Sequence, residues 1–214
     1  MLDAAVLSSP LAGIPGMSSA GPFPRANTAA RSAVTQTNQR LLNVDGRECT
    51  LGEISFVDML NLRGNAGNAR FVGVVLQHTG MHLPLRANGA SIDPQRQLLW
   101  LGPDEWLLKV GNGQGEAIAA ALRVALQGEH CAVVDIGHGN TTLSLHGPGA
   151  ADLLSRGCPL DLHTRVFTTG ALAQSHIAKA NVTLLCLQAG THYEITVRRS
   201  FADYLFRWLC EAGA

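Results

Sequence analysis

His78 and His82 have the spacing that comes nearest to a metal site. Two imidazoles at positions i and i+4 lie on one face of a helix and can hold zinc. However, Gly80 between them is a typical helix end, and Thr79 stands where the zinc-protease motif carries glutamate. We therefore expect ordinary surface histidines and assign no metal ligand.

The glycine-rich segment 111–115, GNGQG, comes just before a predicted helix. Backbone N–H groups at the start of a helix attract anions, so such a segment can hold a phosphate. It has neither the glycine spacing of a dinucleotide site nor the Lys-Ser/Thr pair of a P-loop. We therefore expect a flexible turn and assign no cofactor-binding residue.

Asp135 and His138 are three residues apart, just before a predicted strand. From position alone, two interpretations are equally good. The Asp135 side chain can close a turn by accepting backbone N–H bonds, or the pair can belong to a site.

Neither the cysteines nor the serines lie in a sequence pattern that indicates a catalytic nucleophile. The chain has five cysteines with no close pair, a pattern that fits neither a disulfide framework nor a zinc ribbon. We expect buried, reduced thiols, and no base is visible beside Cys158 to lower its pKa. There is also no Gly-x-Ser-x-Gly elbow, so we assign no catalytic residue.

The large aromatic residues allow two interpretations. They can pack in the core, or they can anchor a protein interface, where Trp and Tyr are enriched. They are Trp100, Trp106, Trp208, Tyr193, Tyr204 and Phe201.

Composition narrows the classes of partner. The chain of 214 residues has 16 basic and 16 acidic residues, so no net field draws it to nucleic acid or to a membrane. With 46% hydrophobic and 15% charged residues, it is typical of a globular protein. No apolar run is long enough to span a bilayer, and we expect a cytoplasmic protein.

Hydrophobic patterning divides the chain at residue 41. Residues 1–40, rich in Ala, Ser, Pro and Gly, predict a mobile tail, and residues 41–214 predict one domain. The first half of that domain predicts a strand over 54–63, then a helix over 69–79 that ends at Gly80. A hairpin over 98–110 and a helix over about 118–126 follow.

The second half repeats this order. It predicts a strand over 142–146, a helix after Pro148, and strands over 182–187 and 192–197. A final helix is expected with Ser200 as its N-cap. Leu60 and Leu143, like Gly64 and Gly147, are 83 residues apart. We therefore predict an α+β fold of two repeated β-α-β-β-α halves, about 54–128 and 132–214.

Three segments in order make the chain resemble a known family. They are 100–108 (WLGPDEWLL), 157–162 (GCPLDL) and 199–205 (RSFADYL) followed by Trp208-Leu209. Together they resemble the gamma subunits of heterotetrameric sarcosine oxidases. The resemblance is close over 98–209 and looser over 41–88.

A more distant similarity concerns residues 135–138 and the Gly147-Pro148 pair. These look like the opening of the folate-dependent aminomethyltransferases, the glycine-cleavage T-proteins, whose fold we expect here. That family carries an acidic residue against the folate. The corresponding stretch here, 180–184, has no carboxylate, so the resemblance does not carry over the transferase activity.

The resemblance implies a non-catalytic gamma subunit of a flavin-dependent sarcosine oxidase, working with alpha, beta and delta subunits. Such a complex converts sarcosine, water and oxygen to glycine, hydrogen peroxide, and formaldehyde or methylene-tetrahydrofolate. FAD, FMN, NAD, zinc and the tetrahydrofolate site would belong to the other subunits, with no cofactor on this chain.

Three alternatives stay open at this stage. The chain can be the equivalent subunit of an N-methylglutamate dehydrogenase complex, because the substrate is chosen elsewhere. It can be a stand-alone folate-binding module of the aminomethyltransferase type, which predicts tetrahydrofolate binding by the chain alone. It can also be an interaction module for an unrelated partner, which predicts a soluble monomer.

Overall fold

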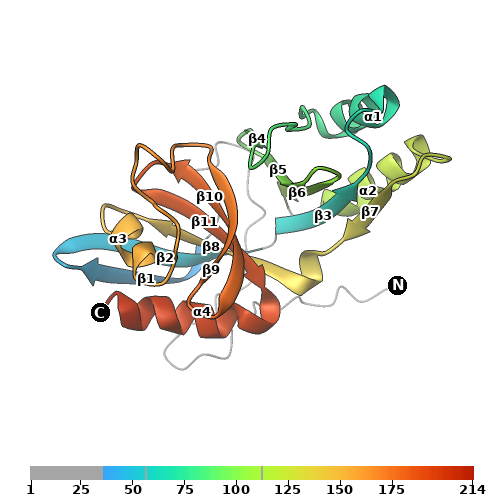
Figure 1. The fold of residues 1–214 in the computed structure, drawn as a ribbon. Coiled ribbons are helices and arrows are strands. Elements are labelled where there is room, and N and C mark those ends of the chain that lie inside the picture. The colour runs from blue at the N-terminus through green and yellow to red at the C-terminus, as the bar shows by residue number, and fades with distance from the viewer. Residues whose placement is uncertain (1–35, 56, 112) are drawn as a thin grey trace, which may run out of the picture.

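A computed structural model describes residues 36–55, 57–111 and 113–214 of the chain. Most of the predicted tail, residues 1–35, lies outside the described residues. The first strand begins at Gln36, five residues before the expected boundary at Leu41. Two antiparallel sheets and four α-helices form the described part of the fold (Figure 1).

We call the six-stranded sheet the large sheet. Its strands lie in the order β1-β2-β8-β11-β10-β9. In chain order their bounds are β1 Gln36–Val44, β2 Arg47–Ile54, β8 Asn140–His146, β9 Leu172–Ile177, β10 Ala180–Gln188 and β11 His192–Arg198.

We call the five-stranded sheet the small sheet. Its strands lie in the order β4-β5-β6-β3-β7. Their bounds are β3 Val57–Arg63, β4 Ala90–Ile92, β5 Arg96–Gly102, β6 Glu105–Gly111 and β7 Ala132–Asp135.

The helices cover the outer face of each sheet. α1 (Ala69–Thr79) and α2 (Gly115–Ala125) lie on the small sheet, and α3 (Ala150–Ser155) and α4 (Arg199–Ala212) lie on the large sheet (Figure 1). A 3-10 turn, η2 (Gly137–Gly139), leads from β7 into β8. The inner faces of the two sheets meet, so the layers run helix, sheet, sheet, helix.

Several sequence predictions are confirmed in detail. α1 begins where the Asn68 side chain accepts bonds from two backbone N–H groups, and it ends at Gly80, whose φ of +72° suits glycine. The predicted hairpin is formed by β5 and β6, with Trp100 opposite Trp106.

Three predictions are corrected. The expected strand over 54–63 is β3, which starts only at Val57, because Ile54 is the last residue of β2 in the large sheet. Each half also has one strand more than the predicted β-α-β-β-α order, namely β4 and β9. β4 is too short, and β9 too poor in β-branched residues, to give a clear strand pattern. Ser200 lies inside α4 rather than at its N-cap.

The two sheets share one strand order. In the small sheet the strands run β4-β5-β6-β3, and in the large sheet β9-β10-β11-β8. Each sheet extends beyond these four strands. In the small sheet β7 pairs with β3, and in the large sheet β2 pairs with β8.

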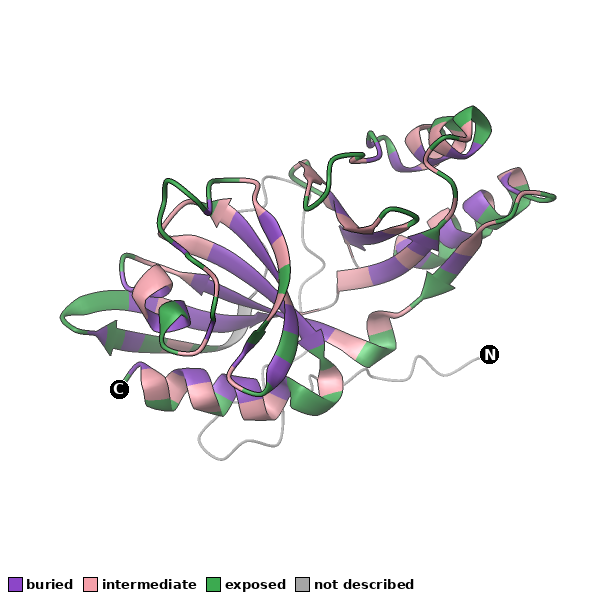
Figure 2. Ribbon diagram, in the orientation of Figure 1, coloured by how far each residue is buried: buried purple, intermediate pink, exposed green. Residues whose placement is uncertain are grey.

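Two large apolar cores and one small core hold these layers together. Figure 2 shows how buried residues run along the strands of both sheets. The large cores lie between each sheet and its helices. The core between the sheets is small, and its fully buried members are Met59, Leu99, Leu107, Leu172 and Leu185. None of the helices in the described part of the chain has the length and apolar character needed to cross a membrane.

Candidate functional site

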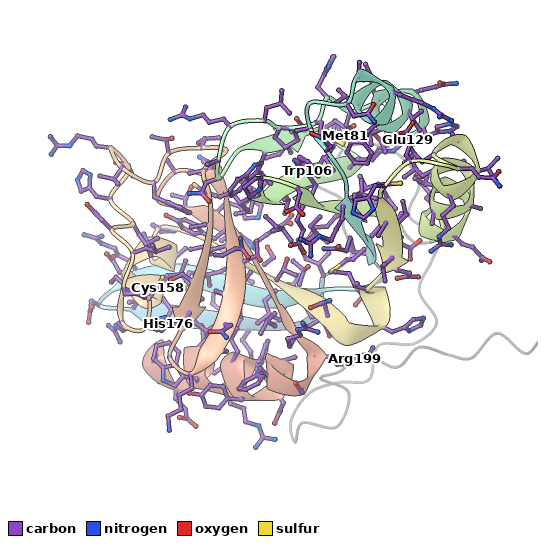
Figure 3. The ribbon with its side chains drawn as sticks, turned by 45° about the vertical axis from the view of Figure 1, so that its right-hand side comes forward. Met81, Trp106, Glu129, Cys158, His176 and Arg199 are labelled. Atoms are coloured by element: carbon purple, nitrogen blue, oxygen red, sulfur yellow. The ribbon has the colours of Figure 1, made fainter. Side chains whose placement is uncertain are left out.

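Trp106, from the first recognised segment, is a core residue. It is fully buried, its ring centroid lies 5.8 Å from that of Phe71, and its Nε1 donates to the Pro84 carbonyl oxygen at 2.9 Å (Figure 3). Trp100 on the neighbouring strand is half-buried against the same core. Of the two interpretations, core packing is therefore confirmed for Trp106.

The second segment packs the loop after α3 against α4. A Cβ on Gly157 would lie 2.3 Å from Cη2 of Trp208, so only glycine allows this approach. Cys158 is buried, with its Sγ 4.0 Å from Ser175 Oγ, and Leu162 is part of the core. The segment is thus explained by packing.

The third segment is the amphipathic helix α4. Leu205 and Leu209 are buried against the large sheet, whereas Phe201 is 43% exposed. The Phe201 ring meets the ring of Tyr204 edge-on, with centroids 6.4 Å apart. The interface interpretation of the aromatic residues therefore stays open for Phe201, which stands at the surface.

The glycine-rich segment before α2 is occupied by the protein itself. The Asp58 carboxylate accepts the backbone N–H of Gly115 at 2.8 Å. A carboxylate thus already sits at the helix N-terminus, where a phosphate would bind. Asn112 lies outside the described residues. This geometry favours the turn that we expected over an anion site.

Asp135 closes a turn. Its Oδ1 accepts the backbone N–H of Gly137 at 2.8 Å, and Asn140 Nδ2 donates to the Ile136 carbonyl oxygen at 2.9 Å. The side chain therefore fixes the path from β7 through η2 to β8, the first of the two interpretations of this segment.

The two histidines of the i, i+4 pair do not share a helix. His78 lies in α1, which ends at Gly80, and His82 follows in the next segment. Across residues 36–55, 57–111 and 113–214, no three His, Cys, Asp or Glu side chains gather in a group that could bind a metal.

Four of the five thiols are poor nucleophiles. All five cysteines are free. Burial raises the pKa of Cys49, Cys131 and Cys210, and it raises the pKa of Cys186 to about 11. Since the thiolate is the reactive form, these groups remain protonated and inert at neutral pH.

One consequence is a loss of stability at alkaline pH. Between pH 9.0, the ordinary thiol pKa, and about 11, Cys186 keeps its proton in the folded chain but loses it in the unfolded chain. The free energy of unfolding should therefore fall as the pH rises through this window. Urea unfolding of the wild type and of Cys186→Ala, from pH 8 to 11, tests this, and an equally steep fall in both would contradict it.

The structure also reveals a polar group that the sequence analysis missed. Glu194 on β11 accepts from Lys109 Nζ at 3.2 Å and from Gln97 Nε2 at 2.9 Å. Gln97 and Lys109 face each other on β5 and β6, so this contact joins the small sheet to the large sheet. All three side chains are buried, Lys109 to 2% exposure. We call Gln97, Lys109 and Glu194 the inter-sheet cluster.

Histidines lie beside this cluster on the large sheet. Ser144, directly opposite Glu194, has its Oγ 3.3 Å from His192 Nε2. The rings of His146 and His192 meet edge-on at 5.8 Å. A lysine within the apolar strand around Lys109 was the sequence signal for such a group, because charged residues are buried only when they are paired.

The inter-sheet cluster gives Glu194 a structural role. Its Oε2 accepts hydrogen bonds from the Lys109 ammonium group and from the Gln97 amide. Bonds of this charge-assisted kind are stronger than neutral ones. The contact joins the two sheets beside the small apolar core between them.

The sequence comparisons with known proteins all point to one family. A family model described as "Sarcosine oxidase, gamma subunit family" matches residues 63–214. The sarcosine oxidase subunit gamma of Corynebacterium sp. (strain U-96) is 33% identical over 171 residues, which cover 78% of this chain and 80% of that protein. The corresponding Arthrobacter protein is 32% identical, covering 76% of this chain and 78% of its own length.

Comparison with solved structures agrees with the sequence comparisons. The chain superposes on a chain of heterotetrameric sarcosine oxidase from Corynebacterium sp. U-96 with a TM-score of 0.74 and 31% identity, covering 80% of this chain and 86% of that one. It also matches aminomethyltransferase T of the Bartonella henselae glycine cleavage system, with a TM-score of 0.52 and 18% identity. That match covers 73% of this chain and 44% of the other, and it shows a shared fold alone.

Proposed function

The chain belongs to the sarcosine oxidase gamma subunit family, and from this membership we propose that it is the non-catalytic gamma subunit of a heterotetrameric sarcosine oxidase. The observation that carries the proposal is the likeness to a chain of the Corynebacterium heterotetramer, at 31% identity over 80% of this chain. The partners would be the alpha, beta and delta subunits, which would carry the FAD, FMN, NAD and zinc.

A structural rather than catalytic role is supported by the recognised segments. Residues of the first two segments pack within the chain, as Trp106 and Gly157 illustrate. The third segment, in α4, covers the large sheet with one face and presents Phe201 at the surface. These features build a stable scaffold for other subunits to contact.

The residues present do not fit the folate chemistry of the aminomethyltransferase fold. The 180–184 stretch lies in β10 and contains no carboxylate. Glu194, opposite Leu185 on the neighbouring strand, is engaged by Lys109. We therefore propose that this chain takes no part in folate chemistry and that another subunit forms methylene-tetrahydrofolate.

We infer further that the two halves of the domain are copies of one β-α-β-β-β-α unit. The shared strand order of the two sheets and the 83-residue offset between Leu60 and Leu143 support this. We also assign the complex to the cytoplasm, because the five cysteines are free thiols.

Co-expression of the tagged chain with the three other subunits tests the subunit role. We expect a yellow complex several times heavier than 22.6 kDa that consumes oxygen when sarcosine is added. A parallel assay with N-methylglutamate and an electron acceptor distinguishes the N-methylglutamate dehydrogenase alternative. A colourless species of 22.6 kDa in the presence of the other subunits would refute the proposal.

A further inference from the structure

His146 on β8 and His192 on β11 lie directly opposite each other in the large sheet. The two strands pair without a bulge, from Asn140 opposite Arg198 to His146 opposite His192. The ring centroids are 5.8 Å apart, with an angle of 65° between the ring planes. The backbone of two central strands therefore holds the two imidazoles side by side.

Both histidines stand on the face of the large sheet that meets the small sheet. Side chains alternate between the two faces of a strand, so His192 shares a face with Glu194, and His146 shares a face with Ser144. Glu194 and Ser144 are buried, whereas the two histidines are only partly buried. Solvent and dissolved ions therefore reach the two rings.

Ser144 orients one of the two rings. Its Oγ lies 3.3 Å from Nε2 of His192, within hydrogen-bonding distance. A hydrogen bond to one ring nitrogen commonly orients an imidazole whose other nitrogen binds a metal ion. Ser144 and His192 thus have the relation that a supporting residue has to a metal ligand.

The separation of the rings suits two ligands of one transition-metal ion. Imidazole binds zinc through a ring nitrogen at about 2.0–2.1 Å, so two imidazoles on a tetrahedral ion have their ring centroids about 5 Å apart. A small rotation of either side chain closes the observed 5.8 Å to this value. Imidazole suits zinc, copper and nickel ions, whereas magnesium and calcium prefer oxygen ligands.

The charges of the inter-sheet cluster do not oppose a cation at this place. Lys109, the basic residue of the cluster, is paired with Glu194 at 3.2 Å. Its positive charge is therefore compensated before any ion binds.

We propose that His146 and His192 form a site for one divalent transition-metal ion, with water in the remaining coordination positions. The site differs from the three-residue groups considered above, because the protein supplies only two ligands. The ion remains exchangeable for the same reason, unlike the zinc ion of a closed four-ligand site.

Zinc titration of the full chain, followed by calorimetry near neutral pH after removal of any affinity tag, tests the proposal. We expect one zinc ion per chain and no binding of magnesium. His146→Gln and His192→Gln should each weaken zinc binding at least about ten-fold, because a single imidazole cannot chelate the ion. His82→Gln removes an exposed histidine of another segment and should bind zinc like the wild type.

Nitrogen NMR of the imidazole rings provides a second measurement on the unaltered protein. The resonances of His146 and His192 should change together as zinc is added, and those of His82 should not. Urea unfolding without zinc verifies that each variant keeps its fold.

Three outcomes overturn the proposal. The first is a wild-type chain that binds zinc only at millimolar concentration, which would mean an adventitious ion only. The second is wild-type zinc binding by a folded double variant, His146→Gln with His192→Gln. The third is an equal loss in His82→Gln, which would place the ion elsewhere. None of these outcomes bears on the subunit role, because the titration uses the chain without its partners.

Discussion

Replacing Lys109 with methionine is expected to lower the free energy of unfolding by about 3–5 kcal/mol. Lys109 Nζ and Glu194 Oε2 lie 3.2 Å apart between the sheets, and both side chains are buried. Methionine fills a similar volume but removes the ammonium group. The Glu194 carboxylate would then remain buried without that partner, which is the expensive arrangement. Urea unfolding of the full chain, followed by circular dichroism, measures the change.

Two controls isolate the effect of the buried charge. The double variant Lys109→Met with Glu194→Leu removes both charges and should regain much of the loss, because a well-packed apolar pair is often as stable as a buried ion pair. Arg207→Met breaks an exposed i, i+4 pair with Asp203 and should change stability by less than about 1 kcal/mol. A Lys109→Met variant as stable as Arg207→Met would show that the inter-sheet cluster does not hold the sheets together.

Local patterns predicted most individual elements because each depends on its own residues. The apolar residues at helical spacing before Gly80 predicted α1. The apolar runs on either side of Pro103 predicted the hairpin of β5 and β6. The break between β2 and β3 was missed because both flanking runs are apolar and only tertiary pairing sends them to different sheets. β9 was missed because its central residues are small or polar.

The inter-sheet cluster could not be predicted from any single segment of the sequence. Gln97, Lys109 and Glu194 are up to 97 residues apart in sequence, and nothing local indicates that their side chains meet. The same limit applies to the recognised segments. Their residues carried the family resemblance, yet the structure shows that Trp106 and Gly157 are fixed by packing partners elsewhere in the chain.

Trp106→Ala is expected to lower the free energy of unfolding by about 3–5 kcal/mol, because truncating a large buried aromatic residue leaves a cavity. The side chain is fully buried against Phe71, and its Nε1 bond leaves the Pro84 carbonyl without this donor once it is removed. Trp106→Phe keeps most of the volume and should cost about 1–3 kcal/mol through the lost hydrogen bond. Urea unfolding of both variants measures the difference.

The exposed aromatic Phe201 provides the matched contrast. Its ring is 43% exposed on α4, so Phe201→Ala should change stability by about 0.5 kcal/mol or less. If Trp106 is a core residue, its alanine variant should impair assembly only as far as it unfolds the chain, and osmolyte that restores folding should restore assembly. A Trp106→Ala chain with wild-type stability that fails to assemble would instead make Trp106 an interface anchor and contradict the packing seen around Pro84.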